Sequence, residues 1–150
     1  MYDPETKEQS FFLSRISYMM DLAKSLNNSG IYYPVLGICN GMQIITLYTT
    51  GKKDKQLYEC KYDNHVPSSL ELTSEFKSSK FWSKLDQEFL KGFFSAKNVY
   101  NSHNCGFDVN KLRNDVEFSK EMNILATGKD TQGLEYVSMV EHKYYPFIGV

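Results

Sequence analysis

The sequence has few cysteines, almost no net charge and no long apolar run. Its 150 residues include three cysteines, Cys39, Cys60 and Cys105, and none forms a C-x-x-C motif or has Cys/His metal-site spacing. We therefore expect neither a disulfide framework nor a zinc centre, whereas one reactive thiol fits this count. The net charge of −1 gives no reason to expect nucleic acid or an anionic membrane as a partner. No apolar run approaches the length of a membrane span.

Internal repeats and low-complexity linkers are also absent, so one domain is expected. A content of 41% hydrophobic and 15% aromatic residues is enough to form a core. Residues 1–5 are polar and do not resemble a signal peptide. Residues 145–150 read as an apolar strand at the very end of the chain. Because domains seldom end inside a buried strand, we expect the chain to be a piece of a longer protein.

The most informative segment is residues 33–41, an apolar strand that ends at a cysteine before a helical pattern. Cys39 lies between Gly37 and Gly41 in a G-x-C-x-G motif. This pattern is typical of a nucleophile elbow, a strained turn between strand and helix. We expect both glycines to avoid collisions between the turn, the strand and the helix. The alternative is that Cys39 is a small buried hydrophobic residue.

A cysteine at a helix N-terminus can act as a nucleophile, because the helix dipole favours the thiolate. The N–H of Asn40 would then face the developing oxyanion. A base is still needed, and the chain has three histidines. His65 and His142 lie in polar or charged segments and are interpreted as solvated loop residues. His103, at the end of a predicted strand, is the candidate, with a satisfied polar core residue as the alternative.

Periodicity predicts the secondary structure around these residues. Helices are expected at 10–26, at 40–49 with Gly51 as cap, and at 79–94. Strands are expected at 33–38, 57–60, 69–73, 98–103, 122–127, 134–140 and 146–150, and the turn 128–133 makes a hairpin of 122–140.

Three segments resemble the gamma-glutamyl hydrolases, cysteine peptidases that cleave folate poly-gamma-glutamates and have a class I glutaminase-like fold. Residues 34–41 resemble the nucleophile segment of that family, and residues 101–106 resemble the stretch with its second active-site histidine. Residues 125–150 resemble its hairpin and the strand that leads to its catalytic histidine. The resemblance covers nearly the whole chain.

The resemblance implies an α/β fold, a class I glutaminase amidotransferase-like (flavodoxin-like three-layer) sheet with helices on both faces, incomplete at both termini. It assigns Cys39 as the nucleophile that forms a thioester with the gamma-glutamyl group, Asn40 as an oxyanion donor and His103 as a substrate contact. It implies no cofactor and no metal. The partner would be a small molecule, a folate or antifolate polyglutamate, and a homodimer is a candidate assembly. Secretion or a lysosomal or vacuolar location is implied, although this chain shows no signal peptide.

The chain also departs from that family. Its members continue after the last strand into Gln-Trp-His-Pro-Glu, which holds the general base. We therefore expect residues 1–150 to be a partial hydrolase domain that lacks the N-terminal strands and the catalytic-histidine segment, with little activity alone. One alternative is the glutaminase domain of an amidotransferase, which Gln43 favours. The other is a non-catalytic binding module or fragment.

Overall fold

The computed structural model describes residues 11–51 and 58–150. The chain forms two compact units, one that ends at Val35 and one that spans Leu36–Val150. Residue 57 of a predicted strand, residue 10 of a predicted helix and the polar segment 1–5 lie outside the described residues.

The first unit contains α1 (Phe11–Asn28), which confirms the predicted N-terminal helix. The side chain of Asn27 fixes the end of this helix. Its Nδ2 donates to the carbonyl oxygens of Ala23 (2.7 Å) and Tyr33 (2.8 Å), and its Oδ1 accepts from the N–H of Tyr33 (3.2 Å). Gly30, with φ of 83°, allows the turn that follows.

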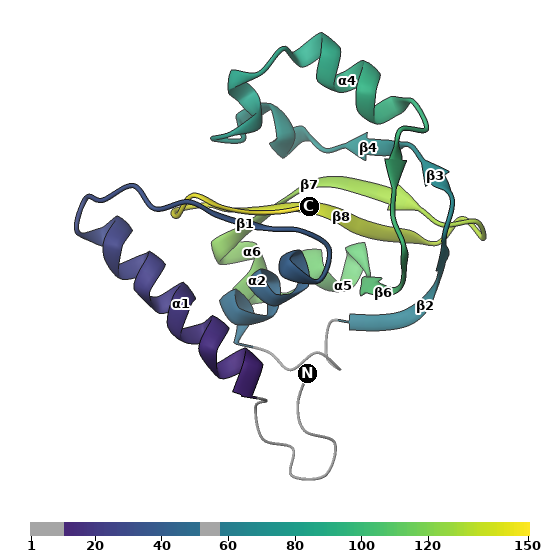
Figure 1. The fold of residues 1–150 in the computed structure, drawn as a ribbon. Coiled ribbons are helices and arrows are strands. Elements are labelled where there is room, and N and C mark those ends of the chain that lie inside the picture. The colour runs from purple at the N-terminus through teal and green to yellow at the C-terminus, as the bar shows by residue number, and fades with distance from the viewer. Residues whose placement is uncertain (1–10, 52–57) are drawn as a thin grey trace. The chain divides into compact units, whose positions relative to one another are not determined.

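The second unit is built on a five-stranded sheet with the strand order β1-β9-β8-β7-β4 (Figure 1). The strands β4, β7, β8 and β9 pair antiparallel. Val150 bonds to both neighbours of Ile38, donating to the carbonyl of Gly37 (2.9 Å) and accepting from the N–H of Cys39 (2.7 Å), which is the pattern of parallel strands. The sheet is therefore mixed. Its strands are β1 (Val35–Gly37), of which Leu36 and Gly37 belong to the second unit, β4 (Leu70–Leu72), β7 (Met122–Lys129), β8 (Glu135–His142) and β9 (Phe147–Gly149).

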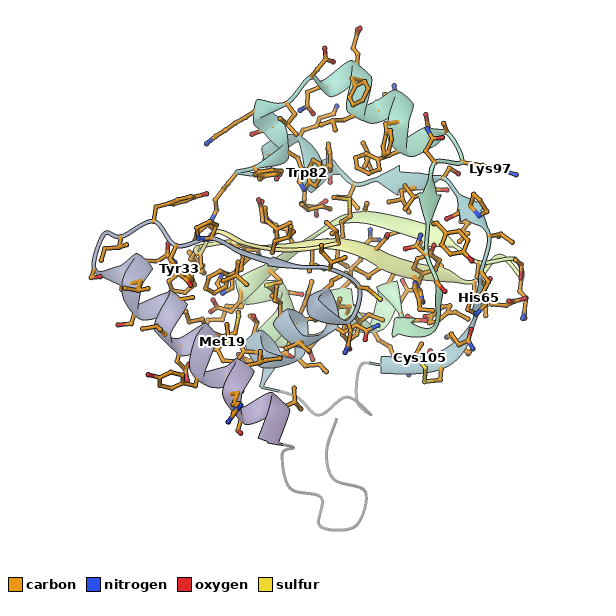
Figure 2. The ribbon with its side chains drawn as sticks, in the orientation of Figure 1. Met19, Tyr33, His65, Trp82, Lys97 and Cys105 are labelled. Carbon is orange, nitrogen blue, oxygen red and sulfur yellow. A yellow bond between two sulfur atoms is a disulfide. The ribbon has the colours of Figure 1, made fainter. Side chains whose placement is uncertain are left out.

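Helices cover both faces of this sheet, as predicted. On one face lie α2 (Asn40–Thr50), α5 (Val109–Arg113) and α6 (Val116–Glu121). On the other lie the 3-10 helices η1 (Ser74–Ser78) and η2 (Trp82–Lys84) and the helix α4 (Gln87–Ser95). The core on this second face is formed by apolar side chains of the sheet, η1 and α4, namely Leu70, Phe76, Leu90, Phe94, Leu125, Ala126 and Met139, with Trp82 packed against them (Figure 2).

The predicted hairpin is confirmed as β7 and β8, and the last predicted strand as β9. Asp130 organises the hairpin turn, because its Oδ1 accepts from the N–H groups of Gln132 (2.9 Å) and Leu134 (2.8 Å). Gly133 has φ of 83°, a conformation that favours glycine.

The prediction of one continuous helix over 79–94 is wrong. The Oγ of Ser79 accepts from the N–H groups of Phe81 (3.3 Å) and Trp82 (3.0 Å), which favours a separate 3-10 turn. Asp86 then caps α4 by accepting from the N–H of Phe89 (2.8 Å). The helical spacing of apolar residues extends across this break. It therefore predicted one helix, although the side chains of Ser79 and Asp86 favour a turn and a new helix start.

The helices α5 and α6 were not predicted. Asp108 caps α5 by accepting from the N–H groups of Asn110 (3.0 Å) and Lys111 (3.1 Å). Asp115 caps α6 by accepting from the N–H of Phe118 (2.9 Å). An aspartate before a short helical pattern is an N-terminal signal that could have revealed both helices.

A disulfide joins Cys60 to Cys105, so the expectation that the cysteines form none is wrong. These cysteines lie in the antiparallel strands β2 (Tyr58–Asn64) and β6 (His103–Phe107), which place them directly opposite each other with Cα atoms 3.9 Å apart. They are 45 residues apart in the chain, and spacing does not reveal strand register. The disulfide lies beside the label of Cys105 in Figure 2.

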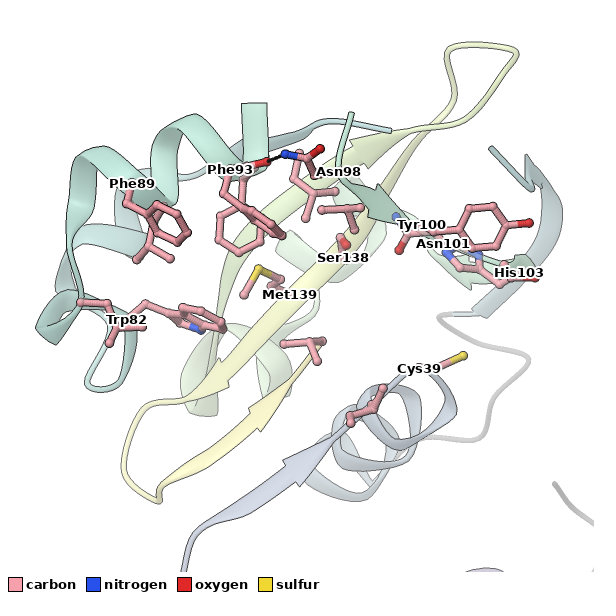
Figure 3. A pocket seen from close by; sticks show the side chains of 18 residues that line it. Cys39, Trp82, Phe89, Phe93, Asn98, Tyr100, Asn101, His103, Ser138 and Met139 are labelled. Carbon is pink, nitrogen blue, oxygen red and sulfur yellow. Dashed lines mark hydrogen bonds between the residues drawn. The ribbon is translucent and has the colours of Figure 1, made fainter. Parts of the chain in front are cut away.

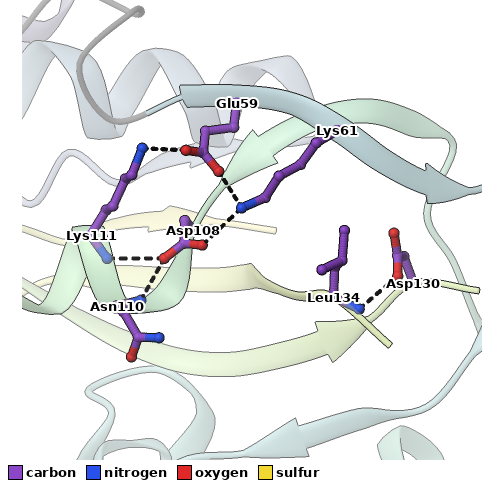
Figure 4. Close-up of polar contacts among 7 residues, drawn as sticks. All are labelled: Glu59, Lys61, Asp108, Asn110, Lys111, Asp130 and Leu134. Atoms are coloured by element: carbon purple, nitrogen blue, oxygen red, sulfur yellow. Dashed lines mark hydrogen bonds and ion pairs between the residues drawn. The ribbon is translucent and has the colours of Figure 1, made fainter. Parts of the chain in front are cut away.

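Charged side chains also tie β2 to the start of α5 (Figure 4). Glu59 pairs with both Lys61 and Lys111, and Lys61 contacts Asp108 at 3.2 Å. Hydrogen bonds from Lys111 and Lys61 lower the pKa of Glu59. Burial works to raise the pKa of Asp108, but the backbone N–H of Lys111 and the ammonium of Lys61 bring it below its usual value. The site-bearing strand β6 is thus held to β2 by the disulfide and, through α5, by ion pairs.

Candidate functional site

Cys39 occupies a strained turn between β1 and α2. Its φ of 55° and ψ of −110° make it the one non-glycine residue with positive φ in the described part of the chain. Its side chain is exposed, and its carbonyl accepts from the N–H of Met42 (3.0 Å). The predicted order of strand, elbow and helix is confirmed. A strained backbone conformation of a non-glycine residue at a helix start is typical of a functional position.

Of the two flanking glycines, only Gly37 is required for close packing. A Cβ built on Gly37 would lie 2.5 Å from the carbonyl carbon and oxygen of Gly41 and 2.6 Å from Cδ1 of Ile45. A Cβ on Gly41 would meet nothing within 4 Å. The expectation that both positions exclude a side chain is therefore wrong for Gly41, because its Cα faces open space.

The strand β9 and the residue after it pack directly against the elbow. Besides the backbone bonds of Val150, Gly149 allows a second close approach, since a Cβ there would lie 2.5 Å from Cγ of Met42. The first turn of α2 therefore rests directly on β9, which fixes Cys39 relative to the sheet.

Cys39 lies at the edge of a cleft of about 760 Å³ that also contains His103 (Figure 3). One wall is aromatic and comes from η2 and α4. The structure brings Cys39 and His103 to the same cleft. The other lining residues are Ile38, Leu70, Trp82, Leu85, Phe89, Leu90, Phe93, Phe94, Asn98, Val99, Tyr100, Asn101, Ser102, Ser138, Met139 and Val150.

The prediction that His103 ends a strand is wrong, because His103 is the first residue of β6. The predicted strand 98–103 divides into β5 (Val99–Tyr100), which pairs with β3 (Pro67–Ser68), and β6, which pairs with β2. The half-buried ring of His103 packs edge-on against Tyr136, with centroids 5.0 Å apart. Burial lowers the pKa of His103, and its electrostatic interaction with His65 lowers it further. His103 is therefore a neutral imidazole near neutral pH.

His65 lies in an exposed loop, as predicted, but it contacts the neighbours of His103. Its Nε2 is 2.6 Å from Oδ1 of Asn104, and its Nδ1 is 3.3 Å from Oγ of Ser102. Both of its ring nitrogens are thus engaged with the segment that carries His103.

His142 is not a solvated loop residue, so that prediction is wrong. It is the last residue of β8, is 0% exposed and lies among the rings of Tyr144, Tyr145 and Phe147. Its Nδ1 accepts from the N–H groups of Tyr144 (3.1 Å) and Tyr145 (3.3 Å). The strand continues two residues further than its apolar pattern indicates, and the following turn closes over the ring. His142 is therefore a structural residue.

Asn40 and Gln43 belong to the first turn of α2. Asn40 is its first residue, at the position where helix N–H groups point out from the helix start. Gln43 is buried, and its Nε2 donates to the carbonyl of Cys105 at 3.3 Å, so it connects the elbow helix to β6. Gln43 does not line the cleft.

The described residues contain no group of three His, Cys, Asp or Glu side chains arranged to hold a metal ion. In the same part of the chain, no helix is both long and apolar enough to cross a membrane. The cleft thus offers an exposed thiol, a neutral imidazole and a helix N-terminus, which together suit acyl transfer to sulfur.

Comparison with known proteins gives a consistent result. Residues 8–150 match the family model described as glutamine amidotransferase class-I. The chain is 24% identical over 149 residues to gamma-glutamyl hydrolase B of Dictyostelium discoideum, covering 99% of this chain and 42% of the relative. It is 24% identical to gamma-glutamyl hydrolase 2 and 27% identical to gamma-glutamyl hydrolase 1 of Arabidopsis thaliana, each over 124 residues, 82% of this chain and 35% of the relative. The chain therefore spans less than half the length of these relatives.

Proposed function

The chain belongs to the class-I glutamine amidotransferase family, and from this premise we propose that it acts on gamma-glutamyl amides through a thioester on Cys39. The observation that carries the proposal is the elbow, in which a strained, exposed Cys39 immediately precedes α2 at the edge of a cleft. The named activity of the three relatives supports the gamma-glutamyl bond as the target.

In this mechanism the Cys39 thiolate attacks the carbonyl carbon of the gamma-glutamyl amide. The N–H of Asn40 donates to the oxyanion that develops on the carbonyl oxygen. The C–N bond then breaks, the amine takes up a proton and leaves, and the acyl group remains on sulfur as a thioester. Water attacks the thioester and releases the glutamyl acid and the free thiol.

His103 contacts the substrate in this proposal. A neutral imidazole can donate one hydrogen bond and accept another, which suits a residue that orients a polar chain beside the nucleophile. The lining of this cleft, all of it in the described part of the chain, contains no aspartate or glutamate that could orient His103 as a strong base. We therefore expect slow turnover from these 150 residues, on the order of 10⁴-fold below an enzyme with a complete triad.

The aromatic wall supports a folate polyglutamate as the substrate class. Trp82, Phe89 and Phe93 present ring surfaces to the cleft. Flat rings pack well against such surfaces, whereas no lysine or arginine of the described residues lines the cleft to bind several carboxylates. The aromatic end of a folate fits this wall better than a run of glutamates does.

The alternative of a glutaminase rests on Gln43. In the structure the amide of Gln43 donates to the Cys105 carbonyl and lies away from the cleft lining. This contact gives Gln43 a structural role, so its presence does not favour free glutamine as the substrate.

The test is hydrolysis of a folate poly-gamma-glutamate, measured at high protein concentration beside gamma-glutamyl hydrolase B of Dictyostelium. Free glutamine and the same peptide with alpha linkages serve as matched substrates. We expect slow cleavage of the gamma-linked chain alone, abolished in Cys39→Ala. Faster ammonia release from free glutamine would favour the glutaminase, and calorimetric binding without cleavage would favour a binding module.

The disulfide supports a secreted or vacuolar location. Disulfides persist in oxidising compartments and are rare in the cytosol, and Cys60 is exposed, where cytosolic reductants would reach it. Isolation of the protein from its cells under alkylating conditions would show the Cys60–Cys105 bond intact, whereas free thiols at both positions would contradict this location.

A further inference from the structure

Behind His103, three aromatic rings meet around buried polar atoms. The ring centroids of His103 and Tyr136 lie 5.0 Å apart, and Tyr62 lies 5.8 Å from Tyr136 and 6.5 Å from His103. His103 Nδ1 and the hydroxyls of Tyr62 and Tyr136 are all buried, and none has a hydrogen-bond partner among the described residues. Buried polar atoms are nearly always paired in native proteins, so three unpaired atoms in one cluster are candidates to pair with one another.

The backbone brings this cluster together. Asp108, the residue that follows β6, forms an isolated bridge with Tyr136 of β8, so the segment that begins with His103 leads to the strand that carries Tyr136. A Cβ built on Gly106 would lie 3.5 Å from Cε1 and 3.7 Å from Nδ1 of His103. The Nδ1 edge of the imidazole is therefore turned back over its own strand, away from the solvent.

Tyr136 is held at its hydroxyl end. It lies directly opposite Gly128 of β7, and a Cβ on Gly128 would lie 2.4 Å from the Tyr136 hydroxyl and 2.5 Å from Cζ. The ring thus lies flat across the neighbouring strand in the space that a side chain would fill. Tyr136 is 0% exposed, so water does not compete for its hydroxyl.

The two groups are complementary as donor and acceptor. A tyrosine hydroxyl donates one hydrogen bond, and one ring nitrogen of a neutral imidazole accepts one. Tyr136 is closer to His103 than Tyr62 is, by centroid distances of 5.0 and 6.5 Å. By centroid distance, the ring of Tyr136 is therefore the nearer of the two tyrosine donors, and the imidazole would turn toward it to form this hydrogen bond.

We propose that Tyr136 is a positioning residue for His103, donating a hydrogen bond to Nδ1 and so fixing the tautomer that carries its proton on Nε2. The inference rests on the proposed function, because in it the Nε2–H of His103 donates a hydrogen bond to the substrate beside Cys39. Tyr136 itself does not touch the substrate. Its role is to select which nitrogen of His103 holds the proton, as a partner of one ring nitrogen does for the other.

The test is nitrogen NMR of the 150-residue protein with labelled histidine, at a pH where His103 is neutral. We expect His103 Nδ1 to have the shift of a hydrogen-bonded acceptor. In Tyr136→Phe, which keeps the ring, this shift moves toward that of an unbonded nitrogen, while Tyr62→Phe, the matched control from the same cluster, leaves it unchanged. This experiment measures the hydrogen bonding of His103 and not turnover. A failure of the proposed function can therefore be told apart from a failure of this proposal.

Two outcomes overturn the proposal. One is a proton on Nδ1 of neutral His103 in the wild-type protein, since Nδ1 would then be a donor. The other is a Nδ1 shift that responds to Tyr62→Phe or to neither variant. If Tyr136→Phe does not fold, the wild-type protein decides the matter: a correlation across the hydrogen bond between the Tyr136 hydroxyl proton and Nδ1 supports the proposal, and its absence overturns it.

Discussion

The substitution Gly37→Ala tests the elbow at its tightest contact. The added Cβ would lie 2.5 Å from the backbone of Gly41 and 2.6 Å from Cδ1 of Ile45. Carbon atoms without a bond between them pack at about 3.5 to 4.0 Å, so the methyl group overlaps with its neighbours by about 1 Å. The tip of Ile45 can rotate away, but the Gly41 backbone belongs to the first turn of α2 and moves only with the helix.

The magnitude follows from this overlap. Insertion of a methyl into a well-packed region costs about 1 to 3 kcal/mol, and we expect the upper half of this range because the nearest atoms are backbone. The helix start must shift by several tenths of an ångström, and Cys39 shifts with it. We therefore expect a lower free energy of unfolding together with a changed reaction rate of the Cys39 thiol.

Gly41→Ala is the matched control, since it adds the same methyl four residues away, in open space. Replacing this glycine in the first turn of α2 should stabilise the protein by about 0.4 to 1 kcal/mol. The assay is urea unfolding of wild type and both variants, with a thiol reagent to follow Cys39, the free cysteine of the chain. Equal effects of the two substitutions, or a neutral Gly37→Ala, would refute this account of the elbow.

Three further outcomes are expected elsewhere in the fold. Replacing Cys60 and Cys105 by serine removes a cross-link over 45 residues. On the chain-entropy account this should lower the free energy of unfolding, measured with urea, by up to about 4 kcal/mol. No loss would show that the ion pairs alone hold β2. Gly128→Ala should displace the ring of Tyr136 and cost about 1 to 3 kcal/mol, measured by thermal unfolding; an unchanged melting temperature would contradict the close approach. Burial lowers the folded-state pKa of His103 below its ordinary value of 6.5, so its contribution to stability is present above pH 6.5 and is lost as the pH falls toward the folded-state pKa. His103→Gln should therefore reduce the pH dependence of the melting temperature over this window, and an unaltered slope would contradict the lowered pKa.

The elements around the elbow could be predicted because each has a local signal. Alternating and helical apolar patterns predicted α1, α2, β7, β8 and β9, and Gly51, with φ of 63°, caps α2 as predicted. Cys39 was identified from two glycines and a change of periodicity, which are properties of neighbouring residues.

The errors concern features that depend on long-range register. The Cys60–Cys105 pair follows from the alignment of β2 with β6, and the burial of His142 follows from the closing of residues 144–147 over β8. The cluster of Tyr62, His103 and Tyr136 joins three strands, and no periodicity within one segment reports such a meeting. The break at Asp86 had a local signal, but the apolar spacing across it was the stronger pattern.

The central claim is that Cys39 forms a thioester with the gamma-glutamyl group. The most direct measurement is mass spectrometry of the protein quenched in acid after mixing with a folate poly-gamma-glutamate. We expect an acyl adduct on the peptide that contains Cys39, formed faster than it is hydrolysed and absent in Cys39→Ala. Cleavage of the substrate that persists in Cys39→Ala, with no adduct on the wild-type protein, would contradict the claim.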